Sequence, residues 1–74
     1  MYMNRPYVIL IDILNTLISS QYIEILDEYT DSIIIRGYFG ELEDGRGNDL
    51  SYLYSHNVYK MKSCDNMLLI YIEP

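Results

Sequence analysis

A serine, a histidine and aspartates are the residue types of a hydrolase triad, and this sequence contains one such set in Ser55, His56, Asp49 and Asp65. No strained nucleophile turn surrounds Ser55, and no Gly-rich segment offers an oxyanion hole. The single cysteine, Cys64, lies in a predicted turn and is interpreted as an incidental thiol. A chain of 74 residues also rarely encloses a substrate. We therefore expect this protein not to be an enzyme.

The segment DGRGNDLSY, residues 44–52, invites comparison with Gly-Asp repeats and EF-hand loops that bind calcium. Asp44 replaces the first glycine of the repeat, and a single copy cannot build a site shared between adjacent turns. The EF-hand spacing fails as well, because Arg46 carries no oxygen ligand and no glutamate closes the loop. One histidine and one cysteine give no zinc cluster. We expect neither a metal nor another cofactor.

Acidic side chains are the most distinctive chemical groups of this sequence. Eight of the 11 acids lie between Glu24 and Asp49. Carboxylates grouped beside tyrosine can bind arginines of a partner through charge-assisted hydrogen bonds, whereas the alternative interpretation is an ordinary solvated surface. The predicted partner-binding residues are Tyr38, Glu41, Glu43, Asp44 and Asp49.

Overall charge and hydropathy restrict the possible partners and compartments. The formal net charge is −6, with 5 basic residues, so the basic patch needed for direct binding of nucleic acid is not expected. Apolar runs are too interrupted for a membrane span, and Asp12 interrupts the N-terminal one where a signal peptide would continue. We expect a single small domain over residues 1–74, located in the cytoplasm and facing a basic protein partner.

The first segment, Pro6–Ser20, has polar residues at a helical spacing and a continuous apolar face that includes Leu10 and Leu14. Pro6 suits a first helical position. We predict a helix here. A strand over Tyr7–Leu14 is the alternative, because β-branched residues are frequent in that stretch.

The remainder reads as two β-hairpins joined by an acidic loop. Ile33, Ile34 and Ile35 mark a strand that we place in the centre of the sheet. Glu41–Asp49 is predicted to be a loop, followed by a single helical turn near Leu53. The predicted strands are Gln21–Leu26, Ser32–Phe39, Asn57–Lys62 and Met67–Glu73, with turns at Asp27–Asp31 and Ser63–Asn66.

These elements predict an α+β fold in which the N-terminal helix packs on a four-stranded antiparallel sheet made of the two hairpins. The helix and one sheet face would form the core. The expected core residues are Leu10, Ile13, Leu14, Leu17, Ile23, Ile25, Ile33, Ile35, Met61, Leu68, Ile70 and Ile72.

One helix covers only one face of such a sheet. The other face would carry Tyr22, Leu26, Ile34, Tyr38, Val58, Leu69 and Tyr71 beside Arg36 and Lys60. Monomers seldom leave so much apolar area in water, so we predict a homodimer formed through Tyr22, Ile34, Leu69 and Tyr71.

The opening segment, the phrase YIEILDEYTDSIIIRGYFGEL and the closing MLLIYIE together resemble a group of short, acidic proteins from phages and mobile elements of Firmicutes, to which some anti-CRISPR proteins are similar in size and charge. The loop EDGRGND is longer than in that group. The resemblance implies an inhibitor that covers the DNA-binding surface of a host enzyme such as a CRISPR nuclease. The alternative function is a structural or regulatory homodimer without DNA mimicry.

Overall fold

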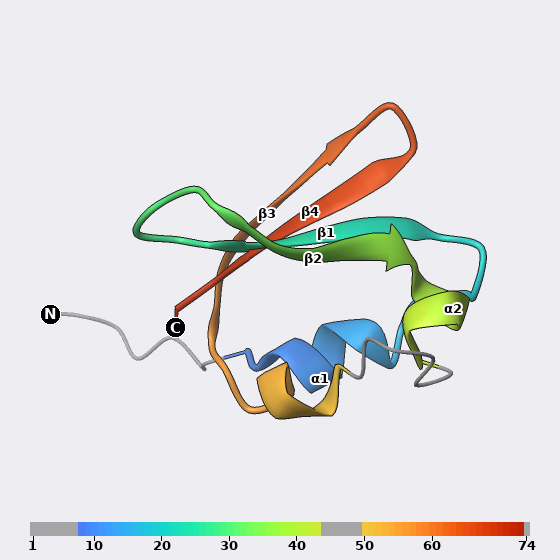
Figure 1. Ribbon diagram of the computed structural model, residues 1–74. Coiled ribbons are helices and arrows are strands. Elements are labelled where there is room, and N and C mark those ends of the chain that lie inside the picture. Colours follow the sequence, from blue (N-terminus) through green and yellow to red (C-terminus); the bar gives the residue numbers. More distant parts are fainter. Residues whose placement is uncertain (1–7, 44–49, 74) are drawn as a thin grey trace, which may run out of the picture.

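The computed structural model describes residues 8–43 and 50–73. Its elements form two layers, with a sheet on one side and short helices on the other (Figure 1). In chain order they are α1 (Leu10–Leu14), β1 (Tyr22–Asp27), β2 (Ile33–Tyr38), α2 (Phe39–Glu43), the 3-10 turn η1 (Ser51–Leu53), β3 (Val58–Cys64) and β4 (Met67–Ile72). The described residues contain four strands and two hairpins, as predicted.

The sheet has the strand order β2-β1-β4-β3. Both hairpins are antiparallel, but β1 and β4 lie side by side in a parallel pair in the centre. The prediction of a purely antiparallel sheet is therefore wrong. The prediction of a central strand at Ile33–Ile35 is wrong too, because β2 pairs only with β1 and forms an edge of the sheet.

Local turn chemistry explains why both hairpins form. Asp65 and Asn66 have φ of 51° and 68°, the left-handed pair of a two-residue turn that matches the twist of the flanking strands. At the other turn, the Asp27 carboxylate accepts hydrogen bonds from the backbone N–H groups of Tyr29 and Thr30 at 2.7 and 3.3 Å. Aspartate stabilises such turns because its short side chain reaches the backbone two residues on.

Helix α1 has only five residues, so the prediction of one long N-terminal helix over Pro6–Ser20 is wrong. It has no side-chain cap; instead, the N–H groups of Leu10 and Ile11 donate to the carbonyls of His56 and Tyr54. At its end, the Thr16 hydroxyl donates to the Ile13 carbonyl at 2.7 Å, a bond that competes with continued helix. A helix this short depends on such tertiary contacts.

The second helix, α2, lies in mid-chain where the sequence predicted the end of a strand and the beginning of a loop. Two long-range bonds hold its first turn, from Phe39 N–H to the Gln21 carbonyl and from Gly40 N–H to the Ser19 carbonyl. A Cβ on Gly40 would lie 2.6 Å from the Ser19 Cβ. Glycine is thus required because the two backbones approach closely.

The core lies between the helices and one face of the sheet. Most predicted core positions are buried or packed against the core, but Ile33 and Met61 remain 46% and 45% exposed. Leucines from α2 and the segment after it were missed. The core cluster consists of Leu10, Leu14, Ile23, Ile25, Ile35, Leu42, Leu50, Leu53, Ile70 and Ile72.

Candidate partner-binding surfaces

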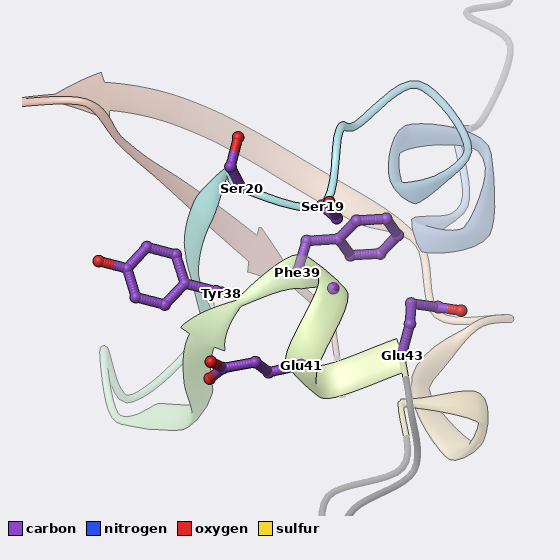
Figure 2. A pocket seen from close by; sticks show the side chains of 7 residues that line it. Ser19, Ser20, Tyr38, Phe39, Glu41 and Glu43 are labelled. Carbon is purple, nitrogen blue, oxygen red and sulfur yellow. The ribbon is translucent and has the colours of Figure 1, made fainter.

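The first candidate surface surrounds α2, where three predicted binding residues lie. Tyr38, Glu41 and Glu43 line one shallow, open depression together with Ser19, Ser20, Phe39 and Gly40 (Figure 2). Tyr38 is 49% exposed, and both carboxylates belong to exposed residues. The fold thus brings these three residues onto one short stretch of surface.

The two glutamates do not converge. Figure 2 shows their side chains leaving α2 in opposite directions, with Glu41 below the Tyr38 ring. Glu43 accepts a hydrogen bond from the Tyr54 hydroxyl at 2.9 Å, which ties α2 to the segment after η1. Asp44 and Asp49, the other two predicted binding residues, lie outside the described residues. Of the two described carboxylates in this set, Glu41 is therefore the one that lies exposed beside Tyr38.

The second candidate surface is the sheet face opposite the helices, here called the open face. Strand register groups its side chains in rows: Tyr38 beside Tyr22, and Arg36 beside Glu24. Continuing across β4 and β3, these rows reach Met67 and Cys64 in the first case, and Leu69 and Lys62 in the second. A third row contains Leu26, Tyr71 and Lys60.

Three of the four predicted dimer residues lie on the open face, and the fourth, Ile34, does not. Tyr22, Leu69 and Tyr71 share the open face by register, and the Tyr22 ring meets the Tyr38 ring edge to face at 5.1 Å. Ile34 lies beside the register shift of the β1–β2 pair and is packed against the core cluster. Val58 also packs against the core rather than on the open face. In their place the register puts Ile33, opposite Leu26, and Met67, opposite Tyr22, on the open face.

Lysines partly cover the open face at its β3 edge. The Lys60 ammonium lies 4.7 Å from the centre of the Tyr71 ring, and the Lys62 ammonium lies 5.7 Å from it. A cation above an aromatic ring is attracted by the negative face of the ring. Lysine stems also shield apolar surface while their charges stay in water. The two lysine ammonium groups consequently lie near the same Tyr71 ring and form one cationic group on the open face.

The two layers of the protein differ in charge. Every base within residues 8–43 and 50–73, namely Arg36, Lys60 and Lys62, lies on the open face. Glu24 is the acid of that face and lies 3.9 Å from Arg36. The acids of α1 and α2, by contrast, have no base on their own helices. Among the described residues, the helical side is therefore acidic and the open face is basic.

The residues of the hypothetical triad are not brought together. A nitrogen of the His56 ring lies 2.8 Å from the Glu73 carbonyl oxygen, at the beginning of β3. Asp65 occupies the turn at the opposite end of that seven-residue strand, roughly 20 Å away at the usual rise of a strand. Asp49 lies outside the described residues.

The described part of the chain holds no group of three or more His, Cys, Asp and Glu side chains that could bind a metal ion. None of its helices has the length and apolar character needed to cross a membrane.

Comparison of the chain with protein-family models, with curated proteins and with solved structures gives no match.

Proposed function

We propose that this chain is a small acidic binding protein, of the kind found in phages and mobile elements, that acts in the host cytoplasm on a nucleic-acid enzyme. It would inhibit such an enzyme, for example a CRISPR nuclease, by covering the basic surface that holds DNA. The observation that carries the proposal is the separation of charge within residues 8–43 and 50–73, where the acids of the helical side can approach a basic surface while the described bases stay on the open face.

Glu41 is the residue expected to contact the partner first. It is exposed on α2, directed away from Glu43, and bordered by the Tyr38 ring. A carboxylate of this kind can accept bidentate hydrogen bonds from an arginine that otherwise binds phosphate or a guanine edge. Tyr38 adds rigid contact area at low entropic cost.

The test is inhibition of purified RNA-guided nucleases, assayed as cleavage of a matched DNA target over a range of salt concentrations. Inhibition should weaken as salt rises, because screening reduces a charge-driven association. Glu41→Lys should weaken inhibition by about 1.5 to 3 kcal/mol, the worth of a hydrogen bond to a charged group.

Glu28→Lys is the matched control, because it changes the net charge equally at the far turn of the β1–β2 hairpin. Asp27 is a poor control, since its carboxylate stabilises that turn. If Glu28→Lys weakens inhibition as much as Glu41→Lys, the effect is one of total charge, and the α2 surface is not the site.

A homodimeric module is the second candidate function, and the open face favours it. Tyr22, Leu69 and Tyr71 are half-buried there, and no described element covers them. Sedimentation equilibrium at micromolar concentration should then reveal a dimer that Tyr71→Glu dissociates and salt does not. A stable folded monomer at that concentration would exclude this candidate.

A further inference from the structure

Strand β3 combines two properties that the proposed acidic site does not use. It forms the outer edge of the sheet. Six of its seven residues are exposed, and they include residues on each face of the sheet. Figure 1 shows the β3–β4 hairpin rising away from the helices, so that its tip lies far from the helical layer. An edge of this kind presents unpaired backbone groups to any strand that can approach.

The protein itself shows that this edge accepts a strand. The Val58 N–H donates to the Val8 carbonyl at 2.8 Å, and Ile9 forms an antiparallel bridge with Asn57. This pairing covers the beginning of β3. No residue of the described chain pairs with the outer edge from Lys60 to Cys64.

Backbone alternation indicates which groups are available there. In a two-residue hairpin the residues that flank the turn, here Cys64 and Met67, exchange hydrogen bonds, and every second pair repeats the pattern. Lys62 and Lys60 therefore bond to β4. The backbone groups of Met61 and Ser63 point outward, away from the sheet.

Side chains determine which strand can pair. Lys60 and Lys62 are two positions apart on the open face, while Met61, 45% exposed, lies between them on the other face. Antiparallel pairing of β3 with its own copy would place lysine opposite lysine in every register centred on these residues, and like charges directly opposite are destabilising. A partner strand with acidic residues at alternate positions places carboxylates opposite both lysines and apolar side chains beside Met61.

We propose that the Lys60–Cys64 edge of β3 binds an extended segment of a partner protein in which acidic and apolar residues alternate, adding a fifth strand to the sheet. Backbone hydrogen bonds would supply the affinity, and the two lysines would provide specificity for a segment with acidic residues at alternate positions. This site is separate from the acidic surface around Glu41. Its two lysines lie on the basic open face, whereas Glu41 lies on α2 of the helical side.

The experiment uses a fluorescently labelled short peptide in which Glu and Val alternate, and a control peptide in which the same residues form two blocks. We expect fluorescence polarisation to show saturable binding of the alternating peptide. The block peptide should bind at least about tenfold more weakly, because only alternation matches the spacing of the lysines. Lys60→Glu with Lys62→Glu should weaken binding of the alternating peptide by more than about tenfold, because attraction becomes repulsion. Arg36→Glu, on the other edge of the same face, should change it less than about twofold.

Amide hydrogen exchange locates the contact. Binding should slow exchange at Met61 and Ser63, whose N–H groups point outward, and leave Lys60 and Lys62 nearly unchanged because β4 already protects them. Equal binding of the two peptides, an equal effect of Arg36→Glu, or protection absent from Met61 and Ser63 would each overturn the proposal. So would tighter binding of a single-stranded oligonucleotide to the face, or protection of Met61 in the free protein through a second copy.

Discussion

The two faces of one sheet have been stabilised by different kinds of interaction. On the covered face, Ile23, Ile25 and Ile70 are fully buried beneath short helices. On the open face, neighbouring residues of the same strands form an edge-to-face tyrosine pair, a long ion pair and lysines above Tyr71. The covered face therefore depends on close packing, whereas the open face consists of pairwise contacts that can be exchanged for contacts with a partner.

The largest effect should come from a core residue of the central strand β4. Ile70→Ala should lower the free energy of unfolding by about 2 to 5 kcal/mol, because a cavity opens where the side chain is completely buried. Its neighbour Leu69 lies on the open face, and Leu69→Ala should cost roughly 1 kcal/mol. Urea denaturation measures both. Equal losses would mean that the two faces do not differ in packing.

The next largest effect concerns the contact between Gly40 of α2 and Ser19. Gly40→Ala, which in an ordinary helix interior would be stabilising, should here cost about 1 to 3 kcal/mol, because the new methyl group collides with Ser19. Thermal unfolding gives the sign. Ser19→Gly in the same chain should recover part of the loss by removing the nearest atom, whereas a stabilised Gly40→Ala would contradict this packing.

A smaller effect is expected for the tyrosine pair of the open face. The double-mutant cycle of Tyr22→Leu and Tyr38→Leu should give a coupling energy of about 0.5 to 1.5 kcal/mol, as for other aromatic pairs. Chemical denaturation of the four proteins measures it. Zero coupling would show that the rings do not hold their edge-to-face arrangement in solution.

The smallest effect should belong to Glu24 and Arg36. Their closest atoms are 3.9 Å apart, and the Arg36 side chain is 61% exposed, so the coupling energy in a double-alanine cycle should be below about 0.5 kcal/mol and should fall further in salt. A coupling as large as that of the tyrosines would show that ionic contacts, rather than rings, organise the open face.

Sequence patterns located the strands because each hairpin is encoded locally. Alternating residues and turn residues such as Asp65 and Asn66 identify β3 and β4 without knowledge of the rest. The parallel contact between β1 and β4 has no local signal, and the purely antiparallel prediction failed there. Helix α2 was missed for a similar reason, since its first turn is held by carbonyls of Ser19 and Gln21.

As with the fold, the parts of the candidate surfaces that depend on local sequence were predictable, and the parts that depend on distant contacts were not. Adjacency along the chain placed Tyr38 near Glu41, and alternation placed Lys60 and Lys62 on one face of a strand. The divergence of Glu41 and Glu43 depends on the unforeseen helix α2. The exposure of β3 as a free edge depends on the order of the strands, which short-range patterns do not contain.

The parallel central pair also determines the order in which the protein can fold. Gln21 and Asn66, 45 positions apart, are joined by a hydrogen bond beside the first residues of β1 and β4. Contacts between such distant residues carry a loop-closure cost before they stabilise anything, so folding slows as they become more important. We expect each hairpin to form early and their docking to limit the rate. During synthesis on the ribosome, Ile23 and Ile25 would remain without β4 until that strand emerges, and the nascent chain is most prone to aggregate in this interval.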